Sequence, residues 1–240
     1  MREPSVDASS VRLAWEATLA TLGDLKAKIA QDLRRSNLTQ EIADAIPQAI
    51  YDHDSERFWW NETYPTPYAL TIAPNSGVDV YSTGTPQGDV YFLAPQGPIQ
   101  EFVRIDMVRA QIPVVWYTVK ASDWTTLEFF YSTLSNGQPS WWAYRDGNLR
   151  IYPLPSQPYN LRIFGQVRLR PLVNDTDSNV WTNQGFNLIR YTVLKRLYSY
   201  PIRDAQQVAN AEQAGERALD YLRRETDRRA RQGRMRAYYG

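Results

Sequence analysis

Apolar residues recur every three to four positions near both ends of the chain, which is the period of an amphipathic α-helix. Thr21 is the expected N-cap of a first helix, because Asp24 three residues later completes a capping box. The apolar face of this helix comprises Leu22, Leu25, Ile29 and Leu33. Thr39 is the expected N-cap of a second helix that continues to about Trp60, and its Pro47 predicts a kink or a restart.

Residues 63–170 have a different pattern, in which β-branched and aromatic residues alternate with turn residues. Strands are expected at residues 78–81, 90–93 and 160–169. Asp146-Gly147 predicts a hairpin, because this dipeptide favours the positive φ angles of a two-residue turn. A short helix is expected at residues 122–133, with Ser122 as its N-cap.

Helical spacing returns after Asn183 and continues to Pro201, and Asp204 begins a last long helix. One face of that helix bears mostly small residues, which let a neighbouring helix approach closely. This stripe comprises Val208, Ala211, Gly215, Ala218, Leu219 and Leu222. The order helix–helix, β region, helix–helix predicts an α+β fold, in which an antiparallel helical bundle built from the N- and C-terminal helices carries an inserted β-rich domain.

The same pattern sets the expected limits of each part. We expect an N-terminal arm at 1–20, a helical bundle from 21–62 and 183–223, an inserted β-rich domain at 63–182, and an Arg-rich C-terminal tail at 224–240. A chain of 240 residues with 43% hydrophobic content is long enough and apolar enough to bury such cores.

Composition then narrows the functional classes. The chain has no cysteine, which excludes disulfide frameworks, zinc–thiolate sites and cysteine catalysis. A net charge of +1 argues against a dedicated nucleic-acid binder, and no apolar run reaches the ~18 residues of a membrane span. The 8 Trp, 16 Tyr and 7 Phe either fill a β-rich core or form a large protein interface, and both readings stay open.

No catalytic constellation is visible in the sequence. The single histidine, His53, lies on the apolar side of its predicted helix, where a structural role is the simpler interpretation. No phosphate loop or dinucleotide fingerprint is present. Residues 174–179 copy the start of a calcium loop, but Val180 replaces its glycine and Phe186 replaces its glutamate. We therefore expect no enzyme activity, no metal and no cofactor.

Charge is most strongly patterned at the C-terminus. From residue 223 onward every basic residue is an arginine, and the arginines outnumber the acids Glu225 and Asp227. Three interpretations stay open: a solvated helix end whose cations suit the helix dipole, a surface that docks onto an acidic protein, and a contact with DNA.

Several segments together carry a family resemblance. They are TLGDL at 21–25, DLRRS at 32–36, LTQ at 38–40 with Ile42, Ala45-Ile46 and Ala49-Ile50, ERFWWNE at 56–62, IYPLP at 151–155 and DTDSNVW at 175–181. In this order they resemble the head-to-tail adaptor proteins, also called head-completion or connector proteins, of short-tailed phages. The ERFWWNE and DSNVW stretches are the most specific parts of the resemblance.

The resemblance implies a structural virion protein at the head–tail junction, made in the bacterial host cytoplasm. It implies a homo-oligomeric ring, typically of twelve copies, beneath the portal protein. It further implies a platform for tail nozzle or fibre proteins and a channel through which packaged DNA passes without sequence-specific binding. No catalytic residue carries over, because the family is structural.

Two groups of residues are the candidates for these contacts. The portal-interface candidates are Arg223, Arg224, Arg228, Arg229, Arg231, Arg234, Arg236, Tyr238 and Tyr239. The candidates for contacts with tail proteins or neighbouring subunits are Trp59, Trp60, Trp141, Trp142 and Trp181. The alternative function is a carbohydrate-binding or glycan-cleaving tail module, which requires tryptophan rings arrayed on an exposed face.

Overall fold

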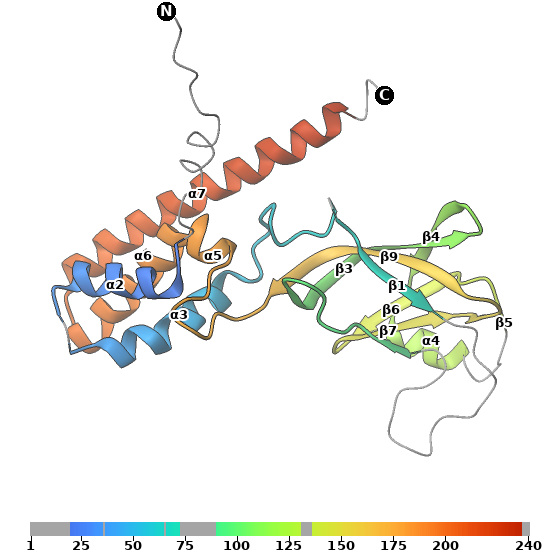
Figure 1. Cartoon of the computed structure of the whole chain (residues 1–240), viewed down its shortest axis with the longest axis horizontal. Coiled ribbons are helices and arrows are strands. Elements are labelled where there is room, and N and C mark those ends of the chain that lie inside the picture. The colour runs from blue at the N-terminus through green and yellow to red at the C-terminus, as the bar shows by residue number, and fades with distance from the viewer. Residues whose placement is uncertain (1–19, 36, 65, 73–89, 131–135, 237–240) are drawn as a thin grey trace, which may run out of the picture. The chain divides into compact units, whose positions relative to one another are not determined.

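The computed structural model describes residues 20–35, 37–64, 66–72, 90–130 and 136–236 (Figure 1). Within these residues the chain has six α-helices and a large curled β-sheet, so it is an α+β protein. Its contacts divide the chain into two compact units, one of residues 1–53 with 171–240 and one of residues 54–170. We call the described parts of these the helical unit and the sheet unit.

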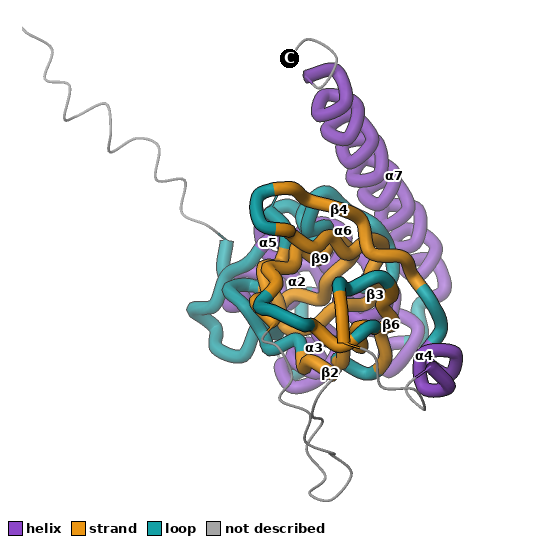
Figure 2. The backbone as a smooth tube through the Cα atoms, turned by 90° about the vertical axis from the view of Figure 1, so that its right-hand side faces the viewer, coloured by secondary structure: helices purple, strands orange, loops and turns teal. Residues whose placement is uncertain are grey.

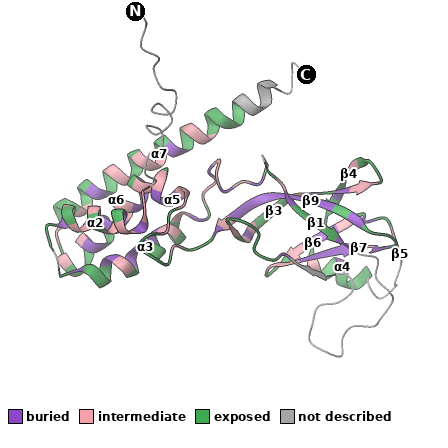
Figure 3. Ribbon diagram, in the orientation of Figure 1, coloured by how far each residue is buried: buried purple, intermediate pink, exposed green. Residues whose placement is uncertain are grey.

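The helical unit is organised around α6. Its long helices are α2 (Leu22–Leu33), α3 (Thr39–His53), α6 (Phe186–Leu197) and α7 (Ala205–Arg236). The short helix α5 (Val180–Asn183) precedes α6, and a π-helical turn, η1 (Tyr198–Ile202), follows it. Helix α6 packs against α2, α3 and α7, and the apolar faces of these helices form a common core (Figure 3).

Helix α2 begins where the sequence predicts, whereas Thr39, the predicted cap of α3, is already its first residue. Thr21 caps α2 and forms the capping box with Asp24, whose backbone N–H donates to Thr21 Oγ1 at 3.2 Å. Helix α3 continues through Pro47 and ends at His53, well before Trp60. The earlier end has a physical cause: the backbone and side chains that follow His53 are engaged by hydrogen bonds within the sheet unit.

Helix α7 is longer than expected. Asp204 caps it, accepting from Gln207 N at 3.1 Å, and the helix continues to Arg236. Most of the segment expected as an Arg-rich tail is therefore helical. The predicted small-residue stripe meets α6, since a Cβ built on Gly215 would lie 3.6 Å from Tyr191 Cβ.

The sheet unit is built on seven strands in the order β1-β9-β3-β4-β6-β7-β2, and the sheet curls on itself (Figure 2). The strands are β1 (Tyr68–Ile72), β2 (Val90–Phe92), β3 (Ile99–Ile112), β4 (Val115–Ala121), β6 (Trp141–Arg145), β7 (Asn148–Tyr152) and β9 (Tyr159–Leu169). The short strands β5 (Asn136–Gly137) and β8 (Leu154–Pro155) form a separate pair. Tyr68 at the β1 edge donates from its hydroxyl to the carbonyl of Ala94, two residues after β2, which brings the two sheet edges together.

The predicted hairpin is confirmed. Strands β6 and β7 pair in antiparallel register from Trp141↔Tyr152 to Arg145↔Asn148. Asp146 and Gly147 have φ angles of 49° and 79°, as a two-residue turn of this type requires. The expected strands at 90–93 and 160–169 correspond to β2 and β9, whereas the expected strand at 78–81 lies outside the described residues.

The short helix α4 (Trp124–Phe130) begins later than expected, and Ser122 is not its cap. Asp123 is the capping residue, because its Oδ1 accepts from Thr126 N at 2.7 Å. Hydrogen bonds from Thr126 and Thr125 hold the pKa of the Asp123 carboxyl down at about 2. None of the helices that the structure describes is both long and apolar enough to cross a membrane.

Candidate functional site

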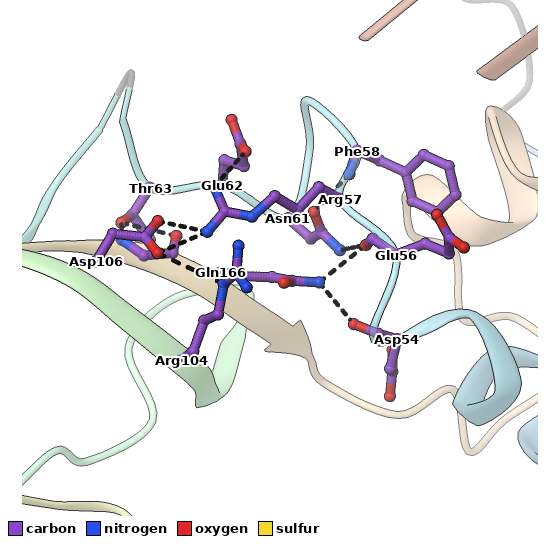
Figure 4. Close-up of polar contacts among 11 residues, drawn as sticks. Asp54, Glu56, Arg57, Phe58, Asn61, Glu62, Thr63, Arg104, Asp106 and Gln166 are labelled. Atoms are coloured by element: carbon purple, nitrogen blue, oxygen red, sulfur yellow. Dashed lines mark hydrogen bonds and ion pairs between the residues drawn. The ribbon is translucent and has the colours of Figure 1, made fainter. Parts of the chain in front are cut away.

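Residues 54–63 form a loop whose polar groups are bound to strand β9 of the sheet unit (Figure 4). Gln166, buried on β9, donates from Nε2 to the carbonyls of Asp54 at 2.8 Å and Glu56 at 2.9 Å. Asn61, also buried, accepts from Phe58 N at 2.9 Å and donates to Glu56 O at 2.8 Å. This loop contains the ERFWWNE stretch, and we call it the motif loop.

The end of the motif loop joins the sheet as an extra bridge. Thr63 N donates to Gly165 O at 3.0 Å, and Gly165 N donates to Thr63 Oγ1 at 2.9 Å. Val167 N donates to Asn61 O at 2.8 Å. The backbone of strand β3 also passes close to Gly165, since a Cβ on Gly165 would lie 2.2 Å from Arg104 O.

Two ion-pair clusters flank the motif loop. Arg57 donates from Nη2 to both carboxylate oxygens of Asp106 at 2.6 Å, and its other terminal nitrogen, Nη1, lies 3.4 Å from Glu62 (Figure 4). On the other flank, Arg168 pairs with Asp54 at 2.7 Å. Burial raises the pKa of the Asp54 carboxyl, and the Arg168 guanidinium opposes that rise. Paired, half-buried charges of this kind hold the loop in one position. Because the charged groups are paired with one another, they are poorly placed to act as catalytic acids or bases.

The aromatic residues of the motif loop anchor it. Phe58 has no exposed surface and stacks on Trp60 at 4.6 Å between ring centroids, while Trp59 meets Trp60 edge-on at 4.4 Å. The rings of Trp59 and Trp60 are half-buried, so part of each still faces solvent. A tryptophan with one exposed face is suited to a contact with another protein.

The DTDSNVW stretch at 175–181 is likewise held by hydrogen bonds, here within the helical unit. The N–H groups of Leu22 and Gly23 at the start of α2 donate to the carbonyls of Asp177 at 2.8 Å and Asp175 at 2.9 Å. Gly23 allows this approach, because a Cβ there would lie 3.1 Å from Asp175 O. The TLGDL and DTDSNVW stretches are therefore docked against each other.

Residues 174–179, which resemble the start of a calcium loop, form hydrogen bonds and ion pairs within the protein. Asp177 accepts from the N–H groups of Val173 and Asn174, both at 2.8 Å, which lowers the pKa of its carboxyl. Asn179 caps α5, and Asp175 pairs with Lys26 at 2.6 Å. Among the described residues no three His, Asp or Glu side chains gather as a set of metal ligands.

The interface candidates occupy different environments. Trp142 is 6% exposed and donates to Val119 O at 3.1 Å, and Trp181 is 2% exposed within the helical unit. Trp141 is half-buried, with Lys120 Nζ 5.3 Å from its ring centroid. Every tryptophan that the structure describes is at least partly buried, so the described residues form no open tryptophan platform for sugars.

The arginine candidates lie on the exposed C-terminal part of α7. Arg228 and Arg229 both bind Glu225, at 2.6 and 2.7 Å, and hold the pKa of its carboxyl down at about 2. The exposed arginines of this segment are Arg223, Arg224, Arg228, Arg229 and Arg231. The side chains of Arg234, Arg236, Tyr238 and Tyr239 lie outside the described part of the structure.

His53 lies in the last turn of α3, and its Nε2 is 3.0 Å from Thr192 Oγ1. Thr192 donates its own proton to Leu188 O, so the hydroxyl accepts from the imidazole. The histidine thus ties α3 to α6 as a structural residue.

Comparison with known proteins agrees with the ordered motifs. The family model described as SU10 adaptor protein matches residues 20–237, which is most of the chain. A search of curated proteins finds no match.

Proposed function

Because the chain belongs to the SU10 adaptor protein family, we propose that it is a head-to-tail adaptor of a short-tailed phage that forms a ring beneath the portal. Members of this family are phage adaptor proteins, which are structural components of the virion. The family match over residues 20–237 is the observation that carries the proposal, since it includes residues of both units and both the ERFWWNE and DTDSNVW stretches.

In this proposal the helices of the helical unit form an antiparallel bundle, and about twelve copies assemble around a central channel. A near-neutral chain suits a channel through which packaged DNA must slide, because an excess of cations would grip its phosphates. The assembled ring then lies at the head–tail junction of the virion, after synthesis of the chain in the host cytoplasm.

The arginine-rich end of α7 is the proposed contact with the portal protein. Arginines such as Arg224 and Arg231 are exposed on a preformed helix, so little backbone conformational entropy is lost when they bind. Guanidinium groups pair with carboxylates in bidentate geometry, which suits an acidic portal surface. Tyr238 and Tyr239 belong to the same proposed contact by their sequence position.

The sheet unit is the proposed platform for tail nozzle or fibre proteins. Its surface carries exposed apolar side chains at Val114 and Val115, in the β3–β4 hairpin, and at Phe129 in α4. The half-buried rings of Trp59, Trp60 and Trp141 add partly apolar surface. We restrict the tryptophan part of the proposal to these three, because Trp142 and Trp181 are buried within their own units.

The test is binding to the portal protein, with cryo-electron microscopy of the mixture. Deleting residues 224–240, or changing Arg224→Glu and Arg231→Glu together, is expected to weaken portal binding at least tenfold. Arg109→Glu removes an exposed arginine from the sheet unit and is the matched control, with wild-type binding expected. Wild-type portal binding by the deletion variant would refute the role of α7, and failure of the wild-type chain to bind would refute the adaptor proposal.

A further inference from the structure

A polar groove of about 470 Å³ opens between α2, α6 and the first turns of α7 in the helical unit. Three cations line it, Lys28 of α2, Arg34 at the C-cap of α2 and Arg190 of α6, against a single acid. That acid, Asp32, already pairs with Arg190 at 2.5 Å and lies 3.7 Å from Lys28. The groove therefore keeps an excess of positive charge, and we call it the basic groove.

The walls of the basic groove also offer neutral donors. Gln207 and Asn210 of α7 form its far side. Arg190 binds Asp32 through Nε, so its two terminal nitrogens remain as donors for a second carboxylate. Cations accompanied by amide donors are the set that recognises carboxylate side chains.

The opposite side of α7 carries the complementary charge. Glu216 and Asp220 are both exposed, and neither makes an ion pair with another described residue. They are one turn apart, with Glu212 one turn earlier and paired to Lys195 at 2.5 Å. Like charges at this spacing disfavour the isolated helix, so an external partner would relieve them. We call Glu216 and Asp220 the acidic stripe.

Helical geometry places the groove and the stripe back to back. Gln207 and Glu216 are about two and a half helical turns apart, as are Ala211 and Asp220, so each pair projects from opposite sides of α7. Arg217 lies about 100° round the helix from Glu216, and Arg224 follows Asp220 by about one turn, so arginines border the stripe at its C-terminal end. One copy thus presents a basic groove on one side and an acidic stripe on the other.

We propose that the acidic stripe of one copy of this chain occupies the basic groove of the next copy, as the head-to-tail contact that builds the assembly. A contact between two different surfaces of identical chains repeats from copy to copy, and closes into a ring when the rotation allows. The two carboxylates span about 6 Å along the helix, and the groove has a volume of about 470 Å³. This inference rests on the proposed ring and names the surfaces that form it.

Charge reversal tests the pairing. Glu216→Lys with Asp220→Lys reverses the stripe, and Lys28→Glu with Arg34→Glu reverses the groove. Each double variant alone confronts like charges at every contact, so we expect self-association to weaken about tenfold or more in sedimentation velocity. An equimolar mixture of the two alternates complementary surfaces, so association is expected to return.

The matched control is Glu41→Lys with Asp44→Lys, which makes the same charge change at exposed positions of α3. It is expected to associate as the wild type does. An equal loss in this control, or no recovery in the mixture, would overturn the pairing. Circular dichroism of each variant separates lost association from lost folding.

Assembly on the portal protein separates this inference from the adaptor proposal. If both reversed variants still form wild-type rings on the portal, the groove–stripe contact is wrong and the adaptor function stands. If the wild-type chain neither associates nor binds the portal, both are wrong. A photo-crosslinking residue in place of Lys28 is expected to capture a second copy. Capture of the portal protein, or of residues 1–19 of the same chain, would name another occupant and overturn the inference.

Discussion

Gly165→Ala is expected to destabilise the sheet unit more than any other single methyl addition at a described glycine. The new Cβ would lie 2.2 Å from Arg104 O and 2.9 Å from Ile105 Cα, and both are backbone atoms that cannot rotate away. Strands β3 and β9 would have to separate by roughly 1 Å, since overpacked atoms cannot overlap. The register shifts along β3 lie on either side of this point, so the close approach is part of how the two strands pair.

The magnitude follows from two losses and one gain. Overpacking of a tight site costs about 1–3 kcal/mol. The two hydrogen bonds that the backbone N–H groups of Thr63 and Gly165 donate to each other's residue would lengthen, and each contributes about 1 kcal/mol. Replacing glycine by alanine restricts the unfolded chain and returns about 0.4–1 kcal/mol. The free energy of unfolding should therefore fall by about 2–4 kcal/mol.

Gly137→Ala is the matched control, because the nearest atoms to its added Cβ are 3.8 Å away, on Pro153. It changes the unfolded state equally and should alter stability by about 0.5 kcal/mol or less. Urea unfolding followed by tryptophan fluorescence suits the comparison, since six of the eight tryptophans lie in residues 54–170. If the two variants unfold within about 0.5 kcal/mol of each other, the tight approach at Gly165 does not exist in solution.

Phe58→Ala should lower the free energy of unfolding by about 3–5 kcal/mol in urea titration, because the ring is fully buried and stacked on Trp60; a loss under about 1 kcal/mol would contradict that burial. Thr21→Ala should lower the free energy of unfolding by about 1 kcal/mol in thermal unfolding, because the cap hydrogen bond is lost. Thr21→Ser keeps the cap and should leave that free energy unchanged. The pKa of Glu225 is lowered from 4.5 to about 2, so its contribution to α7 is complete above pH 4.5 and lost as the pH falls toward 2. Glu225→Gln should remove that acid-dependent loss of helicity in far-ultraviolet circular dichroism, and an unchanged profile would refute the pairing with the arginines.

Local signals were sufficient where the partners are close in sequence. The capping box of Thr21 and Asp24 and the turn at Asp146-Gly147 are each complete within four residues, so both were predictable. The helix cap at 122–123 was harder, because serine and aspartate are both good caps and only the hydrogen bond to Thr126 decides between them.

Long-range pairing accounts for the rest. Residues 54–62 continue a helical pattern in the sequence, and their hydrogen-bond partners Gln166 and Val167 lie more than 100 residues later. No local sequence rule shows that these hydrogen bonds to β9 replace the continuation of helix α3. The arginine-rich segment reads as a tail by its charge, yet Glu225 pairs with two of its arginines, Arg228 and Arg229, and helps the helix to continue. The basic groove was also invisible, because α2, α6 and α7 meet only in the fold.

The stretches that identify the family and the surfaces proposed for partners are physically distinct. In the motif loop, Asn61 and Arg57 are committed to contacts inside the sheet unit, and Gly23 is committed to Asp175 in the helical unit. Residues held this way constrain the fold of the protomer and offer few polar groups to another protein. Exposed charges on α7 have the opposite character, because changing them costs the protomer little. If α7 contacts the portal and the neighbouring copy as proposed, recognition can vary along α7 while the ERFWWNE and DTDSNVW stretches preserve the fold of the protomer.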